Sequence, residues 1–226
     1  MSKSRTLPSR QRSNVIRAYR SRGKTNRDLT LVYSLKTNRD WIIRSGRHLV
    51  HWAIFLETNP EVRTFNLDLD DASIGGAEKK RGLDFDAEVE LASGASEYHK
   101  LLFGENASDS CAQTDVLSNA GQKTVRTFVE TDFSGRGEEA MRWMKVLAYC
   151  AAIRDEQQTE ASQVAITVMR GLSHGVILDV TESMHDFDSQ IALGVISRMA
   201  VLGDIGLDLS SSGFTLSSTW VWRADQ

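Results

Sequence analysis

GLDFDAEVELASGASEYHKLLFG, residues 82 to 104, predicts two β-strands joined by a tight turn. In its first half apolar residues alternate with acidic ones, which is the period-2 pattern of a half-buried strand. The apolar set is Leu83, Phe85, Ala87, Val89 and Leu91, and the acidic set is Asp84, Asp86, Glu88 and Glu90. Residues 92–96 are turn formers, and Glu97 to Phe103 begins a second strand that carries Lys100. The hairpin therefore predicts a sheet with one buried face and one solvent-exposed face.

The polar side chains of this hairpin suggest chemistry. Asp84 and Asp86 on one strand and Lys100 on its neighbour form the arrangement that a metal-dependent nuclease uses. The carboxylates would hold a hard cation, and the lysine would stabilise a phosphate or activate water. The alternative interpretation is that these charged residues only make the solvent-exposed face of the strand soluble. The hairpin by itself favours that second reading.

The segments before the hairpin predict a strand, a helix and a second strand. Leu29 to Leu35 is β-prone, and a polar turn follows to Asp40. A helix is predicted from Ser45 or Gly46 to Thr58, where Asn59-Pro60 stops it. Because this helix is apolar on most sides, it should be buried. Glu61 to Asp70 alternates again and predicts a strand.

The segments after the hairpin complete an α/β unit. Residues 105–122 have little pattern, Val125 to Phe133 predicts a strand, and Glu138 to Arg154 predicts a helix. The expected fold class is therefore α/β, with a mixed sheet and flanking helices over residues 29–157.

The end of the chain changes character and predicts a winged-helix domain over residues 158–226. Three helical segments precede a strand pair, which is the element order of a winged helix-turn-helix. The expected elements are a helix capped by Thr159 and running to Leu172, a short element from Val176 to Ser183, a helix capped by Asp186 or Asp188 and running to Leu202, a stop at Gly203, and strands from Ile205 to Leu209 and from Phe214 to Trp222. Trp220 and Trp222 are expected to pack on the core of this domain.

The third helix of that domain is poorly suited to reading DNA. Asp186 and Asp188 lie at its start, and Arg198 is its only basic residue. Residues 105–226 hold nine basic against seventeen acidic residues, which would repel a phosphate backbone. A protein partner is therefore expected at this domain.

The net charge of −3 conceals a strong segregation of charge. Residues 1–47 hold thirteen Lys or Arg against Asp28 and Asp40. We expect residues 1–28 to form a basic arm that is disordered until it binds DNA, since neutralised phosphates release counterions. The residues expected to contact DNA are Arg5, Arg10, Arg12, Arg17, Arg20, Arg22, Lys24 and Arg27. The alternative is a solvated tail that happens to be basic.

Several classes of protein are disfavoured. The sequence has no apolar run of membrane-spanning length and no signal-type segment, so a cytoplasmic, nucleoid-associated protein is expected. Cys111 and Cys150 lack metal spacing, which fits a reducing compartment. Gly-rich phosphate loops, zinc-ligand spacing and a Ser/His/Asp triad are not recognisable.

The order of motifs over roughly residues 30–226 resembles the TnsA-like endonuclease subunits of heteromeric transposases. Leu56, Glu57, Pro60 and Val62 match the family's motif Leu-Glu-x-x-Pro-x-Val, and Asp84 or Asp86 matches its aspartate on a strand. Tyr98-His99-Lys100 loosely matches its short strand with a polar residue two positions before a lysine. Val129 to Asp132 and Glu139 to Tyr149 match the end of a later strand and the helix that follows it. The resemblance implies a restriction-endonuclease-like PD-(D/E)XK fold that cuts transposon ends with Mg²⁺ or Mn²⁺. It also implies a transposase and an ATPase regulator as partners, expected at the acidic C-terminal domain.

One departure from the family leaves the activity open. The family's metal-binding helix glutamate falls at about Ser45, which offers no carboxylate. His48 and His51 lie on this helix, but imidazoles are poor ligands for magnesium, so core or capping roles are favoured. Three readings stay open: a nuclease with metal on Asp84 and Asp86 and with Lys100 supporting catalysis, a catalytically inactive scaffold of the same architecture, and a winged-helix DNA-binding regulator unrelated to nucleases.

Overall fold

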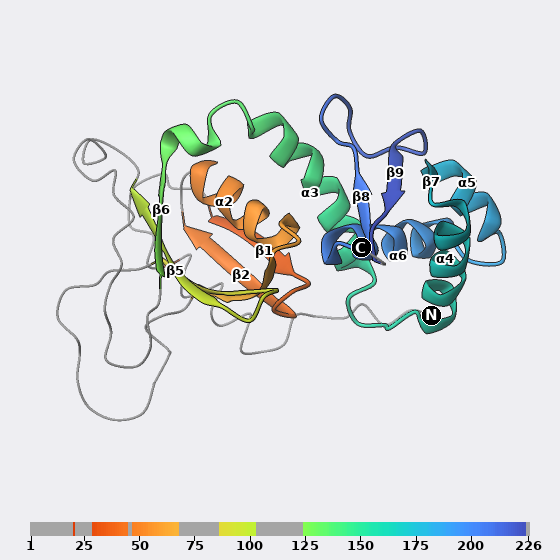
Figure 1. Ribbon diagram of the computed structural model, residues 1–226, viewed down its shortest axis with the longest axis horizontal. Coiled ribbons are helices and arrows are strands. Elements are labelled where there is room, and N and C mark those ends of the chain that lie inside the picture. Colours follow the sequence, from red (N-terminus) through yellow and green to blue (C-terminus); the bar gives the residue numbers. More distant parts are fainter. Residues whose placement is uncertain (1–19, 21–28, 45–46, 68–85, 103–123, 225–226) are drawn as a thin grey trace.

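The computed structural model describes residues 20, 29–44, 47–67, 86–102 and 124–224 (Figure 1). Asp84, Ser45, Cys111 and the predicted DNA-contacting residues other than Arg20 lie outside the described residues. Within the described part the chain is a mixed α/β protein with a four-stranded mixed sheet. None of the described helices is both long and apolar enough to cross a membrane.

A two-stranded antiparallel hairpin begins the fold. Strand β1 (Leu29–Ser34) confirms the first predicted strand, and it pairs with β2 (Arg39–Arg44), which the sequence analysis missed. Over these residues the sequence predicts the end of a turn and the approach to a helix. Trp41 and Ile43 alternate into the core there, but two apolar positions are a weak period-2 signal.

Helix α2 (Arg47–Thr58) lies between this hairpin and the four-stranded sheet. Trp52 and Leu56 pack on the sheet, Ala53 packs on the hairpin, and Ile54 faces the C-terminal helices. The prediction that this helix is buried on most sides is therefore confirmed.

The four-stranded sheet has the order β3-β4-β5-β6, with β3 (Val62–Asn66), β4 (Ala87–Leu91), β5 (Ser96–Leu102) and β6 (Thr124–Val129). The pairs β3–β4 and β4–β5 are antiparallel, whereas β5 and β6 run parallel. The β4–β5 turn contains Gly94 at a φ of 84°, a conformation that glycine adopts at little cost. The predicted hairpin and mixed sheet are thus confirmed.

Strand β6 ends earlier than predicted. The 3₁₀ helix η2 (Glu130–Phe133) follows it directly, because Asp132 Oδ2 accepts a hydrogen bond from the Val129 amide and turns the chain. Helix α3 (Gly137–Ala152) follows and confirms the helix predicted there.

The C-terminal elements alternate helices with short strands. They are α4 (Thr159–Leu172), β7 (His174–Val176), α5 (Ile177–Ser183), α6 (Ser189–Leu202), β8 (Ile205–Leu207) and β9 (Thr219–Trp222). The strands form an antiparallel sheet of order β7-β9-β8. Asp188 caps α6 through the Gln190 amide at 2.8 Å, and Gly203 ends it at a φ of 90°, as predicted. The N-cap of α4 is Gln158, with Thr159 the first helical residue.

Helix α6 is the centre of the largest core. Helices α3, α4 and α5 and strand β8 pack against it, and most of its side chains are buried. Trp220 and Trp222 lie in this core, as predicted. Helix α3 contacts both α2 and α6, so the core is continuous from the N-terminal elements to the C-terminal ones (Figure 1).

Candidate functional site

The structure places Asp86, which lies just before β4, beside the segment of β5 that carries Lys100. The Asp86 amide donates to the His99 carbonyl at 2.9 Å, and Asp86 Oδ2 accepts from the Leu101 amide at 2.7 Å. These two bonds bracket Lys100, so the carboxylate of Asp86 lies beside the backbone of the residue that was expected to support catalysis. Asp86 is exposed and Lys100 is half-buried. The third predicted site residue, Asp84, lies outside the described residues.

The side chains of Lys100 and His99 point to opposite faces of the sheet, because successive residues of a strand alternate. His99 faces α2, where it packs among the aromatic residues of that interface. Lys100 therefore faces away from α2. The helix that would carry the family's glutamate covers one face of the sheet, and the predicted lysine lies on the other.

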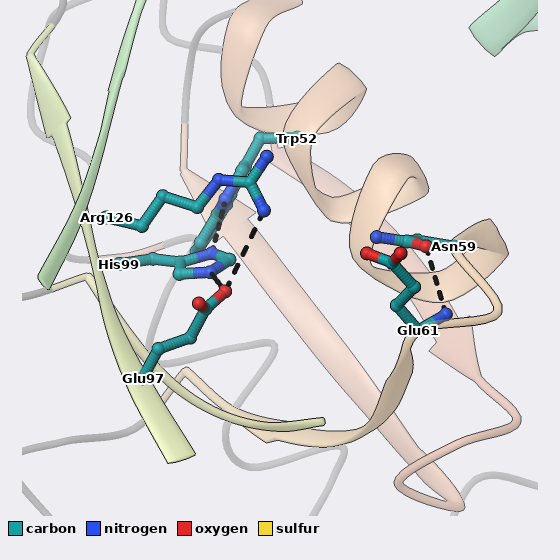
Figure 2. A network of polar contacts seen from close by, with 6 residues as sticks. All are labelled: Trp52, Asn59, Glu61, Glu97, His99 and Arg126. Carbon is teal, nitrogen blue, oxygen red and sulfur yellow. Dashed lines mark hydrogen bonds and ion pairs between the residues drawn. The ribbon is translucent and has the colours of Figure 1, made fainter. Parts of the chain in front are cut away.

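A polar network on the α2 face was not predicted (Figure 2). His99 is completely buried, and its Nδ1 accepts a hydrogen bond from Trp52 Nε1 at 3.3 Å. His99 Nε2 then carries the proton and donates to Glu97 Oε1 at 2.6 Å. Burial lowers the pKa of His99, although the Glu97 hydrogen bond opposes this. The imidazole is thus held neutral, in one tautomer, between the sheet and α2.

Arg126 extends over this network from β6. Its guanidinium lies 4.9 Å from the ring centroid of Phe128 and 5.8 Å from that of Phe55. Its Nη1 is 3.9 Å from Glu97 Oε1, and the Arg126 side chain is 43% exposed against 12% for Glu97. The neutral His99 and the stacked arginine together stabilise the buried end of Glu97. A sequence signal existed in the spacing Glu97-x-His99, which places both side chains on one strand face.

Glu57, which belongs to the phrase Leu56-Glu57-x-x-Pro60-x-Val62, has a structural role. Its carboxylate accepts from Ser34 Oγ at 2.6 Å, from the Leu35 amide at 2.6 Å and from the Lys36 amide at 3.2 Å. It therefore fastens the β1–β2 turn to the end of α2. Burial raises the pKa of Glu57, and these hydrogen bonds oppose the shift.

Lys36 adds further hydrogen bonds between the β1–β2 turn and the end of α2. Its Nζ donates to the carbonyl of Leu56, which has no helical partner because residue 60 is a proline, and to the carbonyl of Asn59 just after the helix. Burial lowers the pKa of Lys36 to about 8. The Asn59 side chain in turn accepts from the Glu61 amide at 3.0 Å, which sets the turn into β3 (Figure 2).

The structure offers no assembled metal centre within its described residues. No group of three or more His, Cys, Asp or Glu side chains gathers there in a way that could hold an ion. His48 Nε2 pairs with Glu130 Oε1 at 2.9 Å, and the His51 ring lies against Gly137. The helix histidines thus connect α2 to η2 and α3, in line with the preferred core and capping roles.

Basic side chains of the C-terminal half are used inside the molecule. Arg142 donates to the carbonyls of Leu209 and Ser210, and Lys145 donates to that of Phe214. Arg198 on α6 donates to three carbonyls that follow α3, namely those of Ile153, Glu156 and Gln157. Arg154 pairs with Asp40 at 2.9 Å. These contacts hold the side chains of Arg142, Lys145 and Arg198 against the backbone, and the pair with Asp40 neutralises Arg154.

Among the predicted DNA-contacting residues, only Arg20 is described, and it is exposed. No family model, curated protein or solved structure matches this chain.

Proposed function

We propose that this protein is a DNA-binding subunit of a transposition machinery, built on an endonuclease-like α/β domain and a winged-helix-like C-terminal domain. The observation that carries the proposal is the segregation of charge. Thirteen basic residues lie within residues 1–47, while the C-terminal half is acidic. At least five of the nine basic side chains of residues 105–226 make contacts within the molecule. DNA binding is thereby assigned to the N-terminal arm.

The element order supports the architectural part of the proposal. A mixed sheet covered by α2 fits an endonuclease-like domain, and the order helix, strand, helix, helix, strand, strand fits a winged helix. Reading of DNA through α6 is not supported, because α6 is mostly buried and Arg198 is bound to backbone carbonyls. The acidic C-terminal domain is the proposed docking site for the transposase and ATPase regulator.

Cleavage would depend on the β4–β5 hairpin. A cleaving subunit would hold Mg²⁺ or Mn²⁺ on Asp84 and Asp86, with Lys100 beside the phosphate. Hard divalent ions need several oxygen ligands, and the described residues supply the Asp86 carboxylate alone, one oxygen of which accepts an amide hydrogen bond. The described donor set does not fit a metal by itself.

A non-catalytic member of the same architecture is the second candidate. It is favoured by Ser45, which has no carboxylate where the family places a glutamate. Such a protein would position DNA through the arm and recruit a catalytic partner through the C-terminal domain.

DNA binding is tested by the salt dependence of affinity for duplex DNA. The logarithm of the binding constant falls with the logarithm of salt concentration by about 0.9 per neutralised phosphate in B-DNA. Eight arm contacts would contribute a slope of about −7. Deletion of residues 1–27 should remove most of this slope, whereas Arg63→Gln, which alters an exposed arginine on β3, should leave it nearly intact. An unchanged affinity and slope after the deletion would show that the arm does not bind DNA.

Cleavage is tested with the products of the neighbouring genes present, since such subunits can be silent alone. Asp84→Ala, Asp86→Ala and Lys100→Ala should each abolish any cleavage in Mg²⁺ or Mn²⁺, and Glu90→Ala on the same hairpin should retain it. Activity that survives all three changes contradicts the site assignment. DNA binding without cleavage in the complete mixture supports the scaffold.

A further inference from the structure

The outer face of the C-terminal sheet carries exposed apolar side chains. In strand β9, Trp220 and Trp222 are buried while Thr219 and Val221 are exposed. Opposed residues of an antiparallel pair share a face, so Val176 and His174 of β7 lie on this outer side with Thr219 and Val221. Val221 is 42% exposed, which is high for a large apolar residue at the end of a packed sheet.

Two further exposed leucines lie beside this sheet, Leu178 in the first turn of α5 and Leu216 in the loop before β9. The Leu178 amide donates to the Leu216 carbonyl at 2.8 Å, so the two residues are direct neighbours. Their side chains are 40% and 47% exposed. We call the surface formed by Leu178, Asp179, Glu182, Leu216, Thr219 and Val221 the α5 face.

The rim of the α5 face is acidic. Glu182 lies one helical turn after Leu178 and therefore on the same side of α5, and Asp179 adjoins it. Asp186 and Asp188 follow α5 and are exposed. Exposed leucines inside an acidic rim fit a basic segment with apolar anchors.

We propose that the α5 face binds the N-terminal segment of this same chain, residues 10–22, RQRSNVIRAYRSR, when no nucleic acid is bound. The segment has five arginines and no acidic residue, and Val15, Ile16 and Tyr19 supply apolar anchors between them. Its charge complements the rim and its anchors complement the leucines. About ten residues separate Tyr19 from β1, and an extended chain of that length spans roughly 33 Å. Tethering also gives the segment a high effective concentration at the surface of its own body.

This contact makes the arm self-inhibited, and DNA must displace it. If the segment is docked for about nine-tenths of the time, the apparent affinity for DNA is about tenfold weaker than that of the free arm. The docking does not depend on the proposed function, whereas its release by DNA rests on it.

Docking is tested by photo-crosslinking in the full chain, with benzoylphenylalanine in place of Tyr19. Crosslinks mapped by mass spectrometry should fall within residues 177–183 and 214–221. The pair Leu178→Ser with Leu216→Ser, which keeps the net charge, should remove them. Glu139→Lys, an exposed change on α3, should leave them in place. Crosslinks that map elsewhere, or that persist in the double serine variant, overturn the proposal.

Competition is tested in the same crosslinking assay and by affinity for duplex DNA. Added DNA should abolish the crosslinks, and Glu182→Lys should raise DNA affinity several-fold more than Glu139→Lys does. Equal gains would mean that the two lysines act only through net charge, which overturns the inhibition. A chain that crosslinks at the α5 face but binds no DNA refutes the proposed function and leaves the docking in place.

Discussion

Replacement of Glu57 should be among the most damaging single changes in the described part of the chain. Glu57 is 1% exposed, and its carboxylate accepts from one hydroxyl and two backbone amides of the β1–β2 turn. In Glu57→Ala these donors lose their acceptor inside the protein. A buried donor without a partner costs about 1–3 kcal/mol, so the free energy of unfolding should fall by about 3–5 kcal/mol. Glu57→Gln keeps one acceptor oxygen and should cost about 1–2 kcal/mol.

Urea unfolding followed by tryptophan fluorescence measures this loss. Trp41 lies in the hairpin and Trp52 on α2, so both report on the contact that Glu57 makes. The matched control is Glu61→Ala, an exposed glutamate four residues away, which should change the unfolding free energy by no more than about 0.5 kcal/mol. If Glu57→Ala lowers the free energy of unfolding no more than that control does, the β1–β2 turn does not depend on the Glu57 carboxylate, and the proposed stabilising role of Glu57 is wrong. If Glu57→Ala does not fold, the comparison of Glu57→Gln with the control still decides the matter.

The pH dependence of the same variants gives a second measurement. Burial raises the pKa of Glu57 above its ordinary value near 4.5, so the folded state binds more protons than the unfolded state between those two values. The Glu57 contribution therefore lowers stability as pH rises from about 4.5 to the folded pKa and is constant above it. Relative to wild type, Glu57→Gln should lack this decline. Parallel pH profiles for the two proteins would contradict the raised pKa.

Three further predictions concern packing, capping and titration. Gly194→Ala should lower the free energy of unfolding by about 1–3 kcal/mol, since its Cβ would lie 2.8 Å from Ile153 Cγ2, while Gly171→Ala, with open space around it, should stabilise by up to about 1 kcal/mol. Thermal melts that rank the two alike would refute the close contact. Asp188→Ala should cost about 1 kcal/mol in urea unfolding through loss of the α6 cap, and Asp188→Asn should recover most of it. For Lys36, whose folded pKa is about 8 against an ordinary 10.5, stability should rise between those pH values, and Lys36→Met should abolish the rise in unfolding experiments across that range.

The elements that could be predicted were those with local signals. The cap at Asp188 and the stop at Gly203 bounded α6, and the turn residues before Glu97 fixed the β4–β5 hairpin. Strand β2 was missed because its only signal was the pair Trp41 and Ile43, and its pairing with β1 is what makes it a strand. A hydrogen-bonded partner outweighs a weak local preference.

The candidate site was predicted only in part for a related reason. The sequence put Asp86 and Lys100 on neighbouring strands; in the structure Asp86 lies just before β4 and is hydrogen-bonded to the backbone on either side of Lys100. It did not show that Lys100 faces away from α2 or that Glu97 and His99 form a network with Trp52. Which face of a sheet a helix covers depends on packing between distant segments.

The sequence by itself determined the main helices, the β4–β5 hairpin and the segregation of charge, because caps, turns, periodicity and composition are local properties. Only the tertiary structure decided how the charges are used. Arg142, Lys145 and Arg198 counted as surface charge in the sequence, yet they donate to backbone carbonyls far along the chain. In the sequence Glu57 belongs to a motif of the transposase-subunit family, whereas in the structure its carboxylate accepts a hydrogen bond from Ser34 of the distant β1–β2 turn. Backbone groups are cut off from water only when segments pack together, and the chain's charged side chains satisfy them there.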